Sequence, residues 1–356
     1  MRTWLWTGVA VLAAGLTAWA GPRLAVDNPI YDFGEVVEGL EVRAVFVLTN
    51  TGDAPLHFTR QPTTTCGCTS APLPKTRLSP GETVELVAMF DTTGYGGRRA
   101  EKHVYVYSDD PASEKLTLTV RGYVRDAAPF QGSASTLNYG FYLLVDLRSP
   151  AEYAAGHLLG AVNIPFPELE NWLGRLPRQR TIYFYDQTGE RAAQAAQLLQ
   201  REGFLAARAI AGGLVGWWQS AGDAFFVWGD GEGQPPSGTP YYGGYAVRAE
   251  YVARSFQLVA DLRPAAEYAA GHLPGSVNLP LPEAAELIGW ADGLPGGGEN
   301  GELWLWLVDG DGEAACRAAQ LLRDHGFSQA RCLIGGLAQW RARYGDALLW
   351  PTPDGE

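Results

Sequence analysis

Two short loops of this chain place an aspartate and a glycine where an apolar strand is expected to pass into a helix. The first loop reads DQTGER, residues 186–191, and the second reads DGDGEA, residues 309–314. Backbone N–H groups and the helix dipole create an anion site at such a junction. A thiolate at the head of the loop would be a strong nucleophile there. Each loop begins with an aspartate instead, and a carboxylate is a poor sulfur carrier whose oxygens can fill the anion site themselves.

The two loops make up the candidate pockets, and two interpretations of their aspartates stay open. In one, the aspartate has converted the pocket into a site for a ligand or a partner. In the other, each aspartate is a helix N-cap whose carboxylate accepts N–H bonds from the loop. Asp186 and Arg191 could also form a local ion pair, worth about 1 kcal/mol where it is partly exposed. The pocket residues are Asp186, Gln187, Thr188, Gly189, Glu190 and Arg191 in the first loop and Asp309, Gly310, Asp311, Gly312, Glu313 and Ala314 in the second.

Both loops belong to a segment that occurs twice in the chain. Residues 143–165 read LLVDLRSPAEYAAGHLLGAVNIP, and residues 258–280 read LVADLRPAAEYAAGHLPGSVNLP. Each copy continues through its loop, as YFYDQTGERAAQAAQLLQREGF or WLVDGDGEAACRAAQLLRDHGF, and closes with AGGLVGWW or IGGLAQW. A repeat of this length indicates two homologous domains, because the units of a solenoid are much shorter.

Short apolar runs, loops and helical stretches alternate within each copy. The runs at 182–185 and 303–308 lead into the two loops, and a helix rich in Ala, Leu and Gln leaves each loop. This order predicts parallel βαβ units with helices on both faces of a sheet. Buried parallel strands read as short continuous apolar runs, as these do.

Both copies resemble the rhodanese (sulfurtransferase) family over most of their length. The resemblance rests on the series D-x-R, EY-x-x-GH and V-N-x-P, on the strand-loop-helix block and on the closing GG-L-x-x-W. It implies a doubly wound α/β sheet and a catalytic cysteine at the head of the loop. In the family that cysteine takes sulfane sulfur from thiosulfate or a similar donor and passes it to a thiophilic acceptor. The cysteine maps onto Asp186 and Asp309, so neither copy has the nucleophile and no catalytic residue is predicted.

The copies differ around the missing nucleophile. Repeat 1 keeps Arg191, where active members often have an arginine, whereas repeat 2 has Ala314. Cys316 and Cys332 are interpreted as small core residues rather than a disulfide. The histidine of the Gly-His turn suggests a general base, but the resemblance implies a structural role for it. The family motif residues are Asp146, Arg148 and His157 in repeat 1 and Asp261, Arg263 and His272 in repeat 2.

The N-terminal third has a different pattern. Residues 1–20 combine Arg2, an apolar stretch and a small-x-small site, which predicts a secretory signal peptide cleaved after Ala20, with an uncleaved anchor as the alternative. Residues 24–125 alternate apolar and polar residues in short runs separated by turn signals, which predicts an all-β Ig-like sandwich. The stretches YDFGEVVEG, TTTCGCTS and LSPGETVEL resemble a bacterial exported Ig-like family of unknown function, which supplies no activity.

The Cys66-Gly67-Cys68 loop admits three interpretations. Its thiols could bind a soft metal such as Cu(I), or zinc, with His57, His103 or Met89 as further ligands. They could form a strained, redox-labile disulfide, or the loop could be purely structural. No other cofactor is expected. Only four cysteines in 356 residues indicate that apolar cores, not a disulfide framework, stabilise the chain.

Composition and patterning predict a multidomain protein. The net charge of −12 (27 − 39) and the absence of a basic run argue against nucleic acid and against an anionic membrane surface as partners. No segment after the N-terminal one is apolar enough to span a bilayer. The expected parts are a signal peptide at 1–20, an Ig-like β-sandwich at 21–126, an α/β rhodanese-like domain at 133–228, a Gly/Pro-rich linker at 229–245 and a second rhodanese-like domain at 246–351.

The predicted function is an exported binding or scaffolding protein, periplasmic or in the cell envelope, with two catalytically inactive rhodanese-like domains. Its partner would be an unidentified protein or a small anionic or sulfur-containing ligand. One alternative is a sulfurtransferase or sulfur-carrier enzyme in which Cys66 or Cys68 receives sulfur. The other is an envelope protein that binds a soft metal at the same loop.

Overall fold

The structure is a computed structural model that describes residues 21–229, 233–280, 283–295, 303–346 and 348–351. The predicted signal peptide at 1–20 and most of the Gly-rich insertion at 295–301 lie outside these residues. The described chain forms two compact units, a β-unit and an α/β unit that holds all the described helices. No helix among the described residues is long and apolar enough to cross a membrane.

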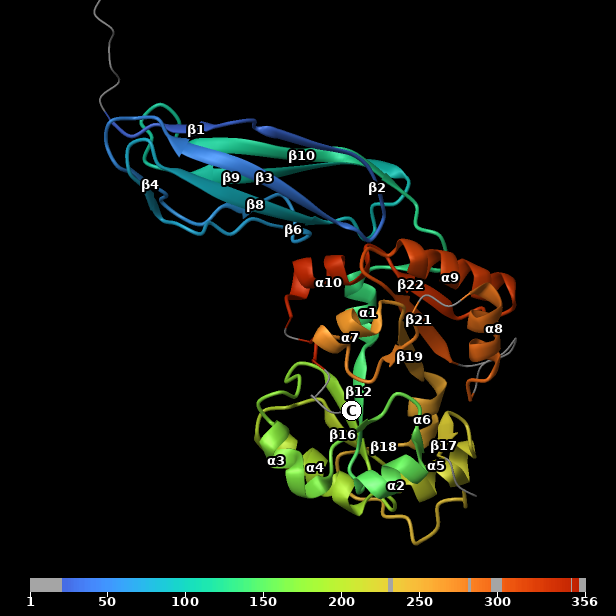
Figure 1. Ribbon diagram of the computed structural model, residues 1–356. Helices are drawn as coiled ribbons and strands as arrows, with labels where there is room; N and C mark the ends of the chain where they lie inside the picture. Colours follow the sequence, from blue (N-terminus) through green and yellow to red (C-terminus); the bar gives the residue numbers. More distant parts are fainter. Residues whose placement is uncertain (1–20, 230–232, 281–282, 296–302, 347, 352–356) are drawn as a thin grey trace, which may run out of the picture. The chain divides into compact units, whose positions relative to one another are not determined.

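The β-unit consists of two four-stranded sheets (Figure 1). Alternate side chains of each long strand are buried, as the sequence pattern predicts for a strand with one face on a core. Rings from the two sheets meet in that core, since Tyr31 contacts Phe46 and Phe33 contacts Phe90. One sheet has the order β1 (Leu24–Val26), β3 (Glu41–Asn50), β8 (Thr83–Asp91), β6 (Thr69–Ser70), and the other β2 (Ile30–Val37), β10 (Lys115–Arg125), β9 (Arg98–Tyr107), β5 (Thr63–Thr64). A small third pair joins β4 (Leu56–His57) to β7 (Arg77–Leu78).

The α/β unit contains two five-stranded parallel sheets, one for each repeat. The first has the order β14 (Val162–Asn163), β12 (Tyr142–Asp146), β15 (Thr181–Tyr185), β16 (Ala207–Ile210), β18 (Ala246–Val247). The second has the order β20 (Val277–Asn278), β19 (Gln257–Asp261), β21 (Trp304–Val308), β22 (Ala330–Leu333), β11 (Gln131–Gly132). A short antiparallel pair, β13 (Gly156–Leu158) with β17 (Phe226–Trp228), accompanies the first sheet.

Helices cover both faces of each sheet because alternate strand residues are apolar on both sides. In the first sheet Leu143 and Val145 pack with the core beneath α4 (Glu190–Arg201), whereas Leu144 packs with the core beneath α5 (Gly213–Ala221). The equivalent helices of the second repeat are α9 (Glu313–Asp324) and α10 (Gly336–Tyr344). The remaining helices are α1 (Ala134–Gly140), α2 (Pro150–Ala155), η1 (Phe166–Glu168), α3 (Leu169–Trp172), α6 (Ala249–Arg254), α7 (Ala265–Ala270) and α8 (Ala284–Asp292). An all-β region followed by two doubly wound α/β domains confirms the predicted fold class.

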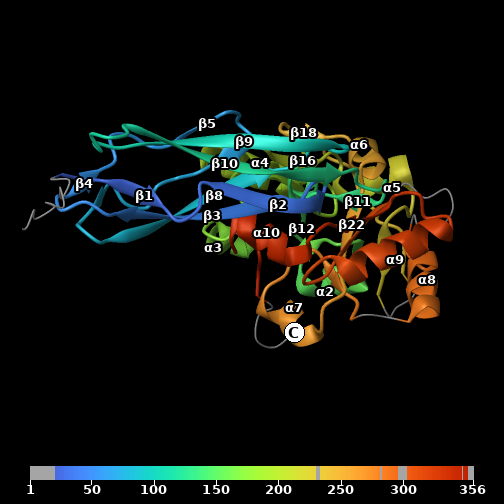
Figure 2. The same cartoon turned by 90° about the horizontal axis from the view of Figure 1, so that it is seen from above.

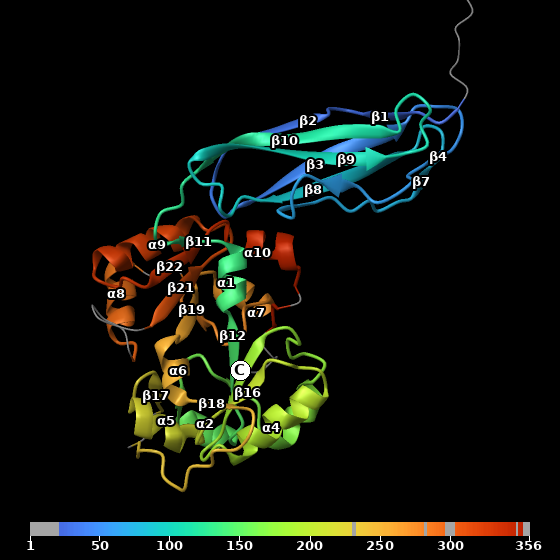
Figure 3. The same ribbon diagram turned by 180° about the vertical axis from the view of Figure 1, so that it is seen from behind.

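The strand and helix that precede each repeat in the chain belong to the sheet of the other repeat. β11 precedes repeat 1 in the chain but pairs with β22, and α1 packs beside α10 (Figure 3). β18 precedes repeat 2 but pairs with β16, and α6 packs beside α5 (Figure 2). Each sheet is therefore completed by a segment from the other repeat, so the domain boundaries at 133–228 and 246–351 divide the chain but do not separate two bodies in space.

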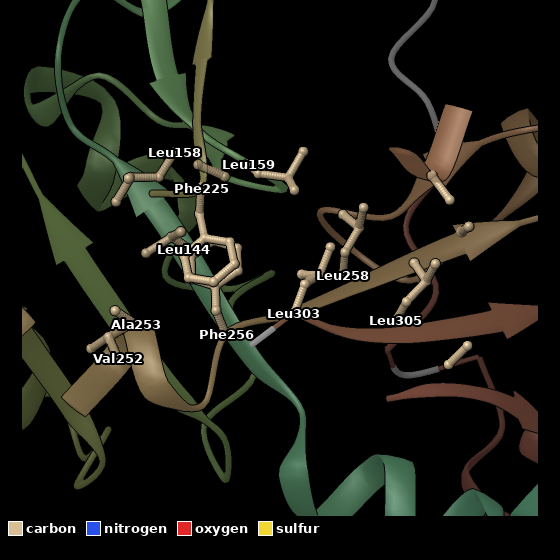
Figure 4. Close-up of a cluster of buried hydrophobic side chains, with 14 of the residues drawn as sticks. Leu144, Leu158, Leu159, Phe225, Val252, Ala253, Phe256, Leu258, Leu303 and Leu305 are labelled. Atoms are coloured by element: carbon tan, nitrogen blue, oxygen red, sulfur yellow. The ribbon is translucent and has the colours of Figure 1, made fainter. Parts of the chain in front are cut away.

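A continuous apolar core joins the two repeats (Figure 4). Phe225 of repeat 1 stacks on Phe256, with ring centroids 4.2 Å apart, and Phe256 itself directly precedes β19 of repeat 2. Trp217 meets the same ring edge-on. These rings are fully or almost fully buried, so the burial of each adds about 1.5–3 kcal/mol to the free energy of unfolding. Neither repeat would gain this stabilisation alone.

Candidate functional site

The first candidate loop lies at the carboxyl end of β15, where the sequence predicts it. β15 ends at Tyr185 and α4 begins at Glu190. Gly189 makes the turn with a φ of 91°, a left-handed conformation that favours glycine. A Cβ at this position would lie 2.8 Å from the backbone nitrogen of Gly213, so the close approach of α5 also requires glycine.

The carboxylate of Asp186 occupies the inside of this loop. Its Oδ1 accepts hydrogen bonds from the backbone N–H of Gly189 at 2.8 Å and of Ala192 at 3.3 Å. The residue is only 5% exposed. Burial raises the pKa of Asp186, and the backbone N–H groups of Ala192, Arg191, Gly189 and Thr188 partly oppose that rise. These N–H groups would otherwise be available to a bound anion.

The second loop repeats this arrangement. The Asp309 side chain is 6% exposed, and its Oδ1 accepts from the backbone N–H of Gly312. Its Oδ2 accepts from Ala314 at 2.9 Å and from Ala315 at 3.1 Å. Both loops are thus filled by their own side chains. The N-cap residues of α4 and α9 are Gly189 and Gly312, so the prediction that each aspartate is itself the N-cap is wrong, although its carboxylate does accept loop N–H groups.

Arg191 does not pair with Asp186, and the suggested ion pair is wrong. The ion pairs among the described residues do not include these two side chains, because the Asp186 carboxylate faces backbone N–H groups inside the loop. Arg191 instead acts on Glu152. Hydrogen bonds from Ser149 hold the pKa of Glu152 below its ordinary value, and the charges of Arg148 and Arg191 lower it further.

Two other segments close the first loop from outside. The N-terminus of α5 donates from Leu214 to the Asp186 carbonyl at 2.9 Å. The Pro-rich linker crosses the loop as well: the N–H of Tyr241 donates to the Thr188 carbonyl at 2.8 Å, and the Gln187 side chain donates to the Ser237 carbonyl at 3.1 Å. The sequence carried no signal for this contact, because nothing in a Gly/Pro-rich segment specifies what it packs against.

The family motif residues form a buried polar cluster at the end of the first strand of each repeat. Arg148 forms a bidentate ion pair with Asp146, with 2.6 Å between Nη2 and Oδ2, and also donates to the Gly156 carbonyl at 2.6 Å. In repeat 2, Arg263 pairs with Asp261 at 2.6 Å and donates to Gly271 at 2.8 Å. The aspartate side chains are fully buried, so these motifs hold the chain between the first strand and the Gly-His turn.

The two motif histidines stack on tyrosines of the preceding helix. The ring centroids of His157 and Tyr153 lie 3.9 Å apart, as do those of His272 and Tyr268. The Nδ1 of each histidine lies 3.0 Å from the carbonyl of the same tyrosine. Burial lowers the pKa of both histidines. Their hydrogen bond and ring contact are those of a structural turn.

All four cysteines form disulfides. Cys66 and Cys68 are joined within their loop. Cys316 of α9 is joined to Cys332 of β22, with Cα atoms 4.8 Å apart, so the interpretation of this pair as separate core residues is wrong. The helix lies directly on the strand and brings the two side chains within disulfide range. A helix position and a strand position 16 residues apart carry no pairing signal until the packing is known.

The described residues offer no cluster of three or more His, Cys, Asp or Glu side chains that could hold a metal ion. The histidines suggested as further ligands have other contacts: His57 lies 3.0 Å from Asp109, and His103 lies 3.2 Å from Thr119. Copper or zinc at Cys66 and Cys68 stays a prediction for the reduced loop.

Comparison with known protein families matches both the β-unit and the two repeats. The rhodanese-like domain family matches residues 132–220 and 248–343. A family described as a protein of unknown function, DUF1573, matches residues 24–124.

Individual relatives match only parts of the chain. The human thiosulfate:glutathione sulfurtransferase is 36% identical over 97 residues, which are 23% of this chain and 84% of that protein. The uncharacterized protein YqhL of Bacillus subtilis is 35% identical over 74 residues, 21% of this chain and 59% of YqhL. The probable adenylyltransferase/sulfurtransferase MoeZ of Mycobacterium tuberculosis is 34% identical over 125 residues, 30% of this chain and 32% of MoeZ. Among solved structures, the Rhodanese_3 like domain of the Anabaena protein Alr3790 is 31% identical, covers 23% of this chain and 95% of that domain, and gives a TM-score of 0.22.

Proposed function

Because the chain belongs to the rhodanese-like family, we propose that it is an exported binding or scaffolding protein whose two rhodanese-like domains do not transfer sulfur. The observation that carries this proposal is the position of the two loop carboxylates. Asp186 and Asp309 accept the N–H groups that would stabilise a thiolate and bind an anionic sulfur donor.

The chemistry of the two positions supports the loss of transfer. Sulfur transfer in this family needs a cysteine sulfur that forms a persulfide, and an aspartate has no such atom. A buried carboxylate also repels thiosulfate, which carries the same sign of charge. An incoming anion would therefore have to displace the side chain from its hydrogen bonds, so small anions fit these loops poorly.

A protein partner suits the surface near the first loop better than a small anion does. Four tyrosines are exposed on the segment that crosses this loop and on α6, which follows it. Their exposed fractions are 49% for Tyr241, 65% for Tyr242, 48% for Tyr245 and 60% for Tyr251. Tyrosine is enriched at protein interfaces because it offers a large apolar ring with a polar end. We infer that this tyrosine-rich segment, residues 241–251, faces the partner.

Two features support export. The N-terminal segment has the pattern of a signal peptide. All four cysteines pair as disulfides in the structure, and disulfides persist in oxidising compartments. Both alternatives, a sulfur carrier and a soft-metal site at Cys66 and Cys68, need free thiols, so the disulfide favours neither.

The decisive experiment incubates the mature protein with thiosulfate and cyanide. We expect no thiocyanate above the rate measured without protein, because neither loop provides a sulfur nucleophile. Human thiosulfate:glutathione sulfurtransferase, assayed with glutathione in place of cyanide, serves as the positive control for the thiosulfate preparation. Robust turnover by the protein would overturn the proposal, and a mass increase of one sulfur on Cys66 or Cys68 would redirect it to the sulfur carrier.

A further inference from the structure

The Cys66–Cys68 disulfide closes over a single residue at an exposed loop tip. The loop joins β5 to β6, which belong to different sheets of the β-unit. Gly67 is exposed, and a Cβ built on it would meet no atom within 4 Å. Both cysteines are half-buried. A thiolate from a partner can therefore approach the disulfide without unfolding of the loop.

Hydrogen bonds hold this loop in place independently of the disulfide. The single hydrogen of the Thr64 hydroxyl is shared between the carbonyl oxygens of Cys66, at 2.9 Å, and Thr69, at 3.0 Å. The Asp91 N–H donates to the Cys68 carbonyl at 2.9 Å, which ties the loop to β8. Breaking the S–S bond would leave these contacts intact. The two reduced cysteines would stay close enough to form the disulfide again.

One hydroxyl serves both sulfur atoms. Thr69 Oγ1 lies 3.6 Å from Cys66 Sγ and 3.8 Å from Cys68 Sγ, both within hydrogen-bond range for sulfur. Thr69 is 5% exposed, so its hydroxyl is shielded from competing water. A hydroxyl that donates to sulfur stabilises the thiolate, which is the leaving group when a disulfide is attacked. Whichever sulfur leaves, the same donor is within reach.

The second disulfide has the opposite character. Cys316–Cys332 spans 16 residues, and Cys332 is fully buried between α9 and its sheet. A disulfide that closes a longer stretch restricts the unfolded chain more and so stabilises the fold more. A ring over one residue restricts the chain least. A stabilising role therefore accounts for the Cys316–Cys332 disulfide but not for the Cys66–Cys68 disulfide.

We propose that Cys66 and Cys68 form a reversible thiol–disulfide exchange site for a protein dithiol, an activity beyond the proposed scaffolding function. A thiolate of the partner attacks one sulfur of the disulfide, and the other sulfur leaves as a thiolate beside Thr69. The second partner thiol, deprotonated, then attacks the mixed disulfide and releases the first cysteine. The partner is oxidised to a disulfide by loss of two electrons, Cys66 and Cys68 gain those electrons, and the two partner protons end on their thiols. No other reactant is needed.

The first test compares the two disulfides within the intact mature protein. The protein is equilibrated in buffers of reduced and oxidised dithiothreitol, the free thiols are alkylated, and the modified cysteines are identified by mass spectrometry. We expect Cys66 and Cys68 to be half-reduced at a ratio of reduced to oxidised dithiothreitol at least about tenfold lower than Cys316 and Cys332. Reduction of both pairs at the same ratio, or of Cys316 and Cys332 first, would overturn the proposal.

The second test measures the rate with a reduced peptide that carries Cys-x-x-Cys. We expect one equivalent of peptide disulfide per protein, no product with C66S, and an unchanged rate with the double variant C316A/C332A. T69V should slow the exchange about tenfold, because a hydrogen bond to a charged group contributes about 1.4 kcal/mol or more, and T69S should restore it. Product formation by C66S would refute the site. Circular dichroism of the full-length T69V variant shows whether it folds. If it does not, the absence of product with C66S still decides whether Cys66 is part of the exchange site.

Discussion

At the scale of single residues, the two loop aspartates hold their own loops together. Asp186 accepts the N–H of Ala192 in α4, and Asp309 accepts the N–H of Ala315 in α9, so part of the N–H groups at each helix start is bound by a side chain of the loop. The surrounding residues are not equivalent. Repeat 1 has Arg191 in the first turn of α4, whereas repeat 2 has Ala314 at the equivalent position of α9.

This difference predicts an asymmetric gain of activity. D186C should transfer sulfur from thiosulfate to cyanide at a measurable rate, because the shorter thiol side chain leaves loop N–H groups available to the sulfur anion. D309C should be about tenfold less active, the factor that corresponds to the loss of one charge-assisted contact of about 1.4 kcal/mol. Thiocyanate formation measures both. Equal rates would show that Arg191 does not contribute.

The buried Asp-x-Arg pairs are expected to be the most sensitive single positions. D146A would leave Arg148 charged and unpaired in the interior, so we expect it to lower the free energy of unfolding by about 3–5 kcal/mol. D261A should do the same in repeat 2, where Arg263 has the same surroundings. Urea unfolding followed by tryptophan fluorescence measures the change.

The control for that prediction removes both members of the pair. D146A/R148M should lower the free energy of unfolding by less than D146A alone, because no buried charge is left without a partner. A double variant that is less stable than the single variant would mean that the ion pair itself, rather than the penalty for breaking it, stabilises the repeat.

At the scale of elements, α4 packs on β16 in repeat 1 as α9 packs on β22 in repeat 2, but only the second pair is joined by a disulfide. Cys316 and Cys332 connect α9 to β22. The two loops are offset by 123 residues (309 − 186), and the same offset places Ala193 on α4 and Ala209 on β16. Both alanines are buried in the core of the first sheet. Repeat 1 therefore supplies a natural cysteine-free counterpart.

Exchange of residues between these positions tests what the disulfide contributes. C316A/C332A should lower the free energy of unfolding by about 3 kcal/mol, as expected for a closed stretch of roughly 15 residues. A193C/A209C should form the corresponding disulfide in repeat 1 and raise stability by a similar amount. Urea midpoints with and without a reducing agent measure both effects. A midpoint of C316A/C332A equal to that of the unaltered protein would contradict this role.

At the scale of the whole α/β unit, each repeat completes the sheet of the other with an exchanged strand and helix. β18 and α6 complete the sheet of repeat 1, and Val252 and Phe256 bury their side chains against that repeat. β11 and α1 do the same for repeat 2. The loss of each buried large apolar side chain costs about 1.5–3 kcal/mol, against a total stability of about 5–15 kcal/mol for a typical domain.

A truncated chain that ends at the domain boundaries predicted from the sequence is therefore expected not to fold. A chain of residues 133–228 lacks β18 and α6, and we expect it to aggregate or to remain unfolded. A chain of residues 142–256 contains the complete first sheet with both covering helices, and we expect it to fold. Circular dichroism and the dispersion of NMR amide signals distinguish the two. Cooperative unfolding of the 133–228 chain would show that the exchange is dispensable.

The sequence by itself determined the repeat, the two α/β sheets, the all-β region and the position of the candidate loops. These features depend on local patterns: continuous apolar runs for β12 and β15, alternation for β3, and Asp186 and Asp309 placed where a strand passes into a helix. Only the tertiary structure decided that the carboxylates fill their own loops and that the Arg191 side chain forms no ion pair with Asp186. It also decided the Cys316–Cys332 disulfide and the exchange of β11 and β18. The physical reason is that each of these depends on contacts between segments that are far apart in the chain or on how two similar repeats pack against each other, and neither is written in a local sequence pattern.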